Sequence, residues 1–126
     1  MIKKIKRPII DFKFYVSRTD DFYYDDINNE YFLKNYSDNI IIYFSIHTGK
    51  KHRDGNYAVK SANELFYYKN GKLNRIDGAA LIIDNIINFS YYFYIDEKWM
   101  YEKEFAKETN HLICKFCEEF CKQRCF

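Results

Sequence analysis

The residues best suited to metal or redox chemistry gather near the end of this 126-residue chain, in the stretch HLICKFCEEFCKQRC. It holds one histidine and all four cysteines of the chain: His111, Cys114, Cys117, Cys121 and Cys125. Cysteine thiolates and imidazole are the usual ligands of structural zinc, and Cys-x-x-Cys is a familiar zinc spacing. Strong zinc sites, however, pair two such elements across an intervening loop, which this stretch does not do.

The spacing of the cysteines argues against one shared metal ion. Apolar residues recur every three or four positions from Ile113 to Cys121, which predicts a helix. On a straight helix the cysteines would span about 16 Å, and zinc–sulfur bonds of about 2.3 Å cannot bridge that length. We therefore expect no cofactor, with the cysteines as thiols or small core residues. Zinc, or a disulfide within or between chains, is the alternative, and either would make this segment an assembly element.

Neither of the other two histidines stands in a catalytic pattern. His47 and His52 flank a turn, and no serine or cysteine occupies the context of a nucleophile elbow. The zinc-protease motif His-Glu-x-x-His does not occur in the sequence either. We therefore expect the protein not to be an enzyme.

Two arginines in the middle of the chain, Arg53 and Arg75, admit two interpretations. A guanidinium group can clamp a phosphate or a carboxylate of a ligand. Each arginine can instead pair with the adjacent turn aspartate, Asp54 or Asp77, or with the acidic residues of segment 18–39. We favour the internal ion pairs.

Tyrosine and phenylalanine dominate the composition, with 13 and 12 residues, and both favour strands. Tyr43, Tyr67, Tyr92 and Tyr94 are expected to line one face of a sheet. Because tyrosine is enriched at protein interfaces, we expect this face to contact a protein partner. Tyrosines interleaved with lysines could instead stack on the bases of single-stranded nucleic acid, which is the alternative function.

The charge and the hydropathy pattern limit the cellular locations and the classes of partner that we expect. A net charge of +2 does not by itself indicate a nucleic-acid or membrane partner. The start MIKKIKRPII resembles a signal peptide, but Asp11 and Lys13 end its apolar run too early. No segment approaches the roughly 20 apolar residues of a membrane helix. We expect an intracellular, reducing location, and a homo-oligomer is compatible with these features.

Alternation of apolar and polar residues with a period of two predicts strands along most of the chain. The clearest segments are 10–16, 40–47 and 89–96, and the shorter ones are 57–60, 64–68 and 79–83. Pairs of turn residues separate the segments, so neighbouring strands must pair antiparallel, since a parallel crossover needs a dozen or more residues. The acidic, asparagine-rich segment 18–39 is expected to form a solvated loop that contains at most one short strand or helix.

The last third of the chain lacks glycine and proline, and its helical period predicts one or two C-terminal helices packed on the sheet. We therefore predict an α+β fold, an antiparallel meander of five to seven strands followed by helix. We expect one domain over residues 1–126. It has an N-terminal strand and loop at 1–39, a meander at 40–99 and a helical, cysteine-rich end at 100–126.

The meander contains an internal repeat. Its second copy follows the first at an offset of 22 residues, and a weaker third copy, residues 92–98, follows residues 66–72 at an offset of 26. A period near 22 is long enough for one hairpin per unit. The matched residues are Gly49, Lys50, Arg53 and Ala58 in the first copy, and Gly71, Lys72, Arg75 and Ala80 in the second.

The stretch FYYKNGKLNRIDGAAL resembles a repeat written Tyr-Lys-Asn-Gly-Lys-Leu-His-Arg-x-Asp-Gly-Pro-Ala. That repeat occurs in uncharacterised proteins of giant DNA viruses of the mimivirus kind and of phages. It is distantly similar to the MORN-like repeats of the YwqK-type antitoxin family. The resemblance covers about residues 40–108 and implies a viral or phage accessory protein that binds a host or viral protein.

The repeat residues are expected to be structural, serving its turns and their ion pairs. They are Gly49, Arg53, Gly55, Asn70, Gly71, Arg75, Asp77 and Gly78. Asn70-Gly71 is a favoured pair for a tight type I′ turn, which needs positive φ at both residues. In the closing copy Glu97 stands where the repeat has glycine, which argues against a tight turn there.

Overall fold

The computed structural model describes residues 1–85, 87 and 89–109. Its N-terminal strands are β1 (Ile2–Ile5), β2 (Asp21–Asp25), β3 (Glu30–Asn35) and β4 (Ile40–Phe44). The central strands are β5 (Val59–Lys60), β6 (Glu64–Phe66), β7 (Tyr68–Lys69) and β8 (Lys72–Leu73). The chain continues through β9 (Leu81–Asp84), β10 (Phe89–Ile95), β11 (Lys98–Met100) and helix α1 (Glu102–Thr109).

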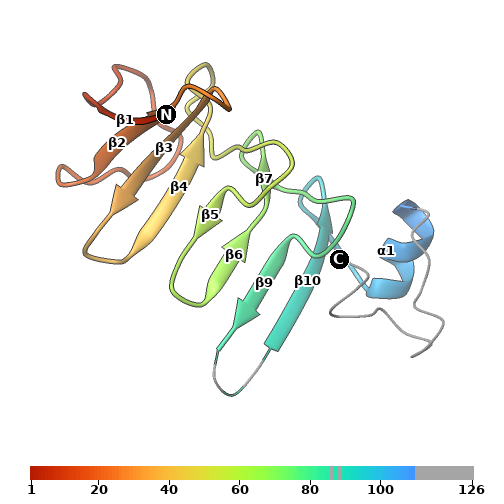
Figure 1. Cartoon of the computed structure of the whole chain (residues 1–126). Coiled ribbons are helices and arrows are strands. Elements are labelled where there is room, and N and C mark those ends of the chain that lie inside the picture. The colour runs from red at the N-terminus through yellow and green to blue at the C-terminus, as the bar shows by residue number, and fades with distance from the viewer. Residues whose placement is uncertain (86, 88, 110–126) are drawn as a thin grey trace.

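Nine of the strands form one sheet in the order β1-β2-β3-β4-β5-β6-β9-β10-β11, and every neighbouring pair is antiparallel (Figure 1). The hairpin β7–β8 forms a separate two-stranded sheet between β6 and β9 in sequence. The strands therefore pair in chain order, as the short connections require. The predicted α+β meander is confirmed, although it has more strands than expected.

The register places one apolar residue of most strands in a single row across the sheet. Directly opposed residues share a face, because side chains alternate sides along each strand. The row runs through Ile5, Phe22, Leu33, Ile42, Val59, Phe66, Leu81 and Tyr92. We call the side on which this row lies the row face, and the other side the reverse face.

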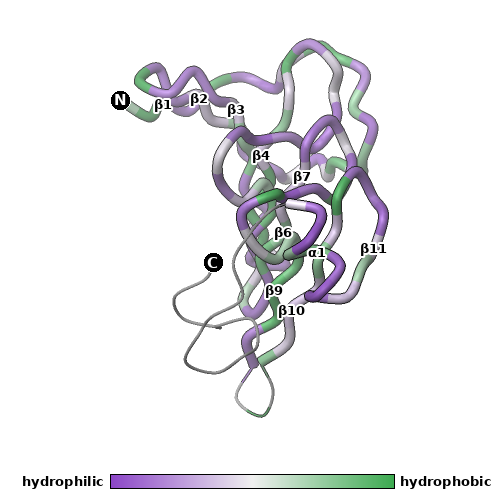
Figure 2. Tube along the Cα trace, turned by 90° about the vertical axis from the view of Figure 1, so that its right-hand side faces the viewer, coloured by the Kyte–Doolittle hydropathy of each residue, from purple (hydrophilic) through white to green (hydrophobic). Residues whose placement is uncertain are grey.

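Two hydrophobic cores lie at opposite ends of the sheet and on opposite faces. At the N-terminal end Phe22, Leu33 and Phe44 are buried on the row face. At the C-terminal end Phe93 lies on the reverse face. There it packs against Phe105 from α1, with the two ring centroids 4.7 Å apart. Figure 2 looks at this end of the array, with α1 in front of the sheet. Each end is thus closed by a different element.

Residues 10–16 close the N-terminal end, but they do not form the expected strand. The segment has no regular secondary structure, although the Lys13 N–H donates a hydrogen bond to the Gly49 carbonyl at 2.8 Å. Its alternating apolar residues still point one way and pack on the first core: Ile10, Phe12, Phe14 and Val16. Alternation predicted the buried side correctly, whereas the prediction of a strand was wrong.

The segment 18–39, expected to be a loop, forms the hairpin β2–β3 and the turn into β4. Two four-residue connections, 26–29 and 36–39, each end in an asparagine with φ of 53°, Asn29 and Asn39. Asparagine tolerates this left-handed conformation better than most residues. The loop expectation was wrong. It rested on the acidic turn residues and gave too little weight to the aromatic residues between them, which form the strands.

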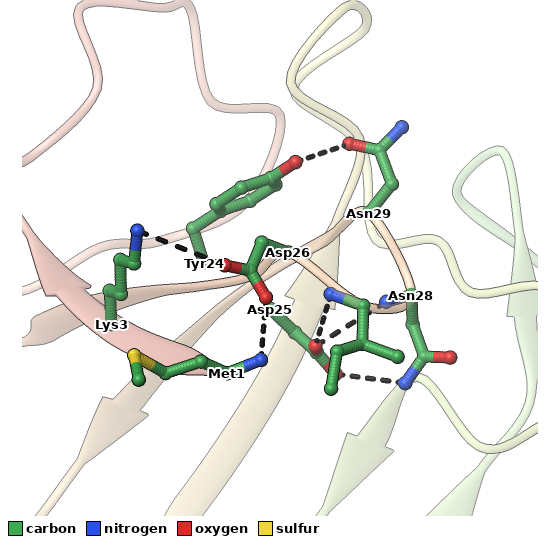
Figure 3. A network of polar contacts seen from close by, with 8 residues as sticks. Met1, Lys3, Tyr24, Asp25, Asp26, Asn28 and Asn29 are labelled. Carbon is green, nitrogen blue, oxygen red and sulfur yellow. Dashed lines mark hydrogen bonds and ion pairs between the residues drawn. The ribbon is translucent and has the colours of Figure 1, made fainter.

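A polar network fixes the first of these turns (Figure 3). The buried Asp25 carboxylate accepts hydrogen bonds from the backbone N–H groups of Ile27 and Asn28 and from the Asn28 side-chain amide, 2.9 Å away. The Asn28 amide, followed by the backbone donors, lowers the pKa of Asp25 below its ordinary value. The ionised carboxylate therefore stabilises the folded hairpin.

The repeat seen in the sequence is also a repeat of hydrogen bonds. The Gly71 N–H donates to the Lys51 carbonyl at 2.8 Å, and the Glu97 N–H donates to the Leu73 carbonyl at the same distance. From the first bond to the second, the donor moves by 26 residues and the acceptor by 22. These are the same offsets that relate the copies in the sequence. Each turn is therefore bonded to the unit that precedes it.

The turns themselves follow the repeat more closely than their residues suggest. Asn70 and Gly71 have φ of 50° and 81°, as the type I′ turn requires. Asp96 and Glu97 also have positive φ, 52° and 71°, and Ile95 pairs with Lys98 across them. The expectation that Glu97 prevents a tight turn was therefore wrong, because the bond from its N–H to Leu73 holds the backbone in place.

Replacement of Gly49 by alanine is expected to destabilise the protein more than the same change at Gly55. Both glycines have similar positive φ, 70° and 73°, which costs an alanine about 1 kcal/mol. A Cβ at Gly49 would also collide with the carbonyl of Asp11, whereas at Gly55 no atom lies within 4 Å. Urea denaturation of both variants measures the difference. Equal losses would contradict the docking of segment 10–16 on this turn.

Acid is expected to weaken the β2–β3 turn through Asp25. A carboxylate with a lowered pKa in the folded state stabilises above the unfolded pKa of about 3.9, and this stabilisation is lost as the pH falls through the folded value. Asp25→Asn should therefore unfold more easily than wild type at neutral pH, with a difference that shrinks below about pH 3.9. Denaturation curves at several pH values test this. A difference independent of pH would contradict it.

Candidate functional site

Arg53 lies in an aromatic and acidic cage at the first repeat unit. Its guanidinium carbon is 3.8 Å from the ring centroid of Tyr43 and 5.2 Å from that of Tyr57. Its Nε donates to Glu30 Oε2 at 2.9 Å, and Nη1 donates to the Tyr57 carbonyl. A stacked, ion-paired and largely buried arginine of this kind is a strong internal contact.

Arg75 repeats this arrangement 22 residues later. It lies 4.0 Å from the ring centroid of Tyr67, donates from Nε to Asp77 at 2.8 Å and from Nη1 to the Ala79 carbonyl at 3.1 Å. Ala79 stands where the first unit has Tyr57, so the second ring is absent. Both arginines thus form internal ion pairs of the kind favoured from the sequence. Both guanidinium groups therefore tie strands and turns together within the chain.

The four tyrosines expected on one face are divided between two. Tyr92 belongs to the row that contains Ile42, so Tyr43, one residue further along β4, lies on the reverse face. Tyr67 follows Phe66 of the row and is likewise covered by an arginine. Tyr94 lies with Tyr92 on the row face, two residues further along β10. The expectation of one shared face was wrong, because it ignored the register between repeat units.

Tyr43 is partly buried. Desolvation raises the pKa of Tyr43 above its ordinary value, although the neighbouring Arg53 acts in the opposite direction. Its ring also contacts that of Phe32 on the adjacent strand in a tilted arrangement, with centroids 5.0 Å apart. Tyr43 therefore contributes to packing, and only part of its side chain is left exposed.

The His52 side chain stabilises the repeat turns. His52 Nδ1 accepts a hydrogen bond from the Asn70 backbone N–H at 3.0 Å, and its Nε2 lies 3.4 Å from Asp54. In the next unit the Asn74 side chain accepts the equivalent bond from the Asp96 N–H at 2.8 Å. A histidine and an asparagine thus perform one task in successive copies, which supports a structural role for His52.

A polar groove of about 820 Å³ opens between the β2–β3 turn and residues 44–47 and 52–56. His47, His52 and Ser45 all line it, so it holds the residue types of a hydrolase. The Ser45 hydroxyl, however, accepts hydrogen bonds from the backbone N–H groups of His47 and Thr48. It caps the turn, and its contacts do not link it to either imidazole as a nucleophile.

An exposed aromatic cluster lies on the last hairpin. Tyr92 and Tyr94 of this cluster were singled out from the sequence, but Trp99 and Tyr101 were not. Tyr94 pairs with Trp99 across β10 and β11, and Trp99 meets Tyr101 edge-to-face with ring centroids 4.6 Å apart. Trp99 is 46% exposed, Tyr101 65% and Tyr92 37%. We call Tyr92, Tyr94, Trp99 and Tyr101 the aromatic patch. Trp99 is the single tryptophan of the chain, which was the available signal.

Comparison with protein-family models, with curated proteins and with solved structures gives no match. The candidate zinc or disulfide residues, His111, Cys114, Cys117, Cys121 and Cys125, lie outside the described residues. Within the described residues, no group of three or more potential ligands could hold a metal ion. No helix in that part of the chain is long and apolar enough to cross a membrane.

His52→Ala is expected to lower the free energy of unfolding by about 1 kcal/mol, because the Asn70 N–H loses its acceptor. His52→Asn should cost less, since Asn74 shows that an amide oxygen can replace the imidazole nitrogen. Chemical denaturation of the two variants measures this. If both variants lose the same free energy of unfolding, the hydrogen bond from the Asn70 N–H is not what His52 contributes to stability.

Proposed function

We propose that this chain is a non-enzymatic protein-interaction module that binds its partner through the aromatic patch. The observation that carries the proposal is the exposed Trp99–Tyr101 pair, two large rings in edge-to-face contact at the end of the sheet. Tryptophan and tyrosine are the residues most often found as anchors at the centre of protein interfaces. The partner is a protein with an apolar recess that receives these rings.

The position of the patch supports this assignment. Backbone pairing of β11 with β10 fixes Trp99 opposite Tyr94, so the patch is presented on a rigid hairpin. A rigid aromatic surface loses little conformational entropy on binding, which favours affinity. The internal role of Arg53 and Arg75 points the same way, because it leaves the polar repeat residues occupied within the chain.

The setting of the proposal comes from the repeat. Proteins with the similar repeat belong to giant viruses and phages, so we propose a viral or phage accessory protein whose partner is a host or viral protein. MORN-like kinship and an intracellular location are part of the same proposal.

The test compares partner capture by wild type, by Trp99→Ala/Tyr101→Ala and by the control Tyr15→Ala, in a lysate of the organism that encodes the chain. Tyr15 is 85% exposed and lies outside the patch. A partner should be retained by wild type and the control, and its capture should fall at least about tenfold with the double variant. Thermal melts establish that all three are folded. A protein captured equally by all three would contradict the proposal.

A further inference from the structure

A second groove, of about 490 Å³, lies beside the hairpin β7–β8. Four lysines line it, Lys13, Lys50, Lys51 and Lys72, together with the ring of Tyr68. They come from three separate parts of the chain: segment 10–16, the first repeat turn and the second repeat turn. The fold therefore gathers positive charge that is dispersed in the sequence.

Two of these lysines have no acidic partner among the described residues. Lys13 pairs with Asp11, Lys72 lies 3.6 Å from Asp96, and the carboxylate of Glu97 lines the same groove. For Lys50 and Lys51, no carboxylate oxygen of residues 1–85, 87 and 89–109 lies within 4.0 Å of the ammonium nitrogen. An anion brought into the groove would meet two ammonium groups that no carboxylate of the described residues neutralises.

The environment of Lys51 strengthens this conclusion. Its ammonium nitrogen lies 5.0 Å above the centroid of the Tyr68 ring, and burial lowers its pKa below the ordinary value. A partly desolvated ammonium group gains more from an incoming anion than a fully hydrated one. Lys50 lies beside it, with its aliphatic chain against Gly71.

The lysines also follow the repeat. Lys50, Lys72 and Lys98 occupy the same position after the three turns, at the offsets of 22 and 26 residues. Each unit adds two strands, so successive lysines are displaced by about 10 Å along the array at the usual strand spacing. Lys50 and Lys72 both line the groove, and positive charges repeated along the array suit an extended polyanion better than a single small anion.

The side chains of the groove suit a phosphate backbone. Lysine binds phosphate as a point charge and does not require the fixed bidentate geometry of arginine. Within the described part of the chain, no arginine lines this groove. We propose that the groove binds the phosphodiester backbone of a single strand of RNA or DNA.

The test is fluorescence anisotropy with labelled oligouridine and oligothymidine, using the full chain in reducing buffer over a range of salt concentrations. Release of counterions from about three contacted phosphates predicts a slope of log K against log salt near −2 for a single strand. Lys50→Gln/Lys51→Gln should weaken binding about tenfold and reduce the slope by about 0.7 per lysine. Lys60→Gln is the matched control, because Lys60 is exposed on β5 and does not line the groove.

A gain-of-binding variant guards against a loss that reflects misfolding. Glu97→Gln removes the carboxylate that lines the groove and should raise the affinity several-fold, since it deletes a repulsive charge. Binding of either oligonucleotide with this pattern supports the proposal. It is overturned if binding does not depend on salt, if Lys60→Gln matches the double variant, or if polyglutamate displaces the strand as well as an unlabelled oligonucleotide does.

Discussion

The backbone hydrogen bond that joins each repeat turn to the preceding unit is the constraint on which the rest of the structure depends. Through it the Gly71 and Glu97 amides each meet a carbonyl one unit back. The bond sets the stacking of the turns, and the stacking brings His52 to Asn70 and Asn74 to Asp96. It also aligns the post-turn lysines and holds Glu97 at a φ that its side chain disfavours.

The repeat explains why the meander was predictable from the sequence and the N-terminal third was not. Turn pairs such as Asn70-Gly71 act locally, so their residue types predict their conformation directly. The role of residues 10–16 depends on contacts with Gly49, far along the chain, and alternation cannot distinguish a strand from an extended cover. In segment 18–39, asparagine was the available sequence signal for tight turns, and Asn29 and Asn39 do adopt positive φ. The acidic composition of the segment obscured this signal.

The candidate surfaces were less predictable, for a related reason. A period of two identifies which residues share a face within one strand, but not which residues share it after a turn. Tyr43 and Tyr92 therefore appeared equivalent, although the register separates them. The ion pairs of Arg53 and Arg75 could be predicted without knowledge of the register. Their expected partners were the adjacent turn aspartates and the acidic segment 18–39, both of which are visible in the sequence. The groove beside β7–β8 joins three segments, and only the folded chain reveals it.

The placement of the two cores has a consequence for how the molecule tolerates change. Phe22, Leu33 and Phe44 stabilise one end, Phe93 and Phe105 the other, and the two-residue strand β5 lies between them. In arrays whose units contact only their neighbours, stability is a sum of local terms. Loss of one core should thus leave the other end folded, and a further repeat unit could be inserted near β5 without disturbing either end. The length of this protein is in that sense adjustable by duplication.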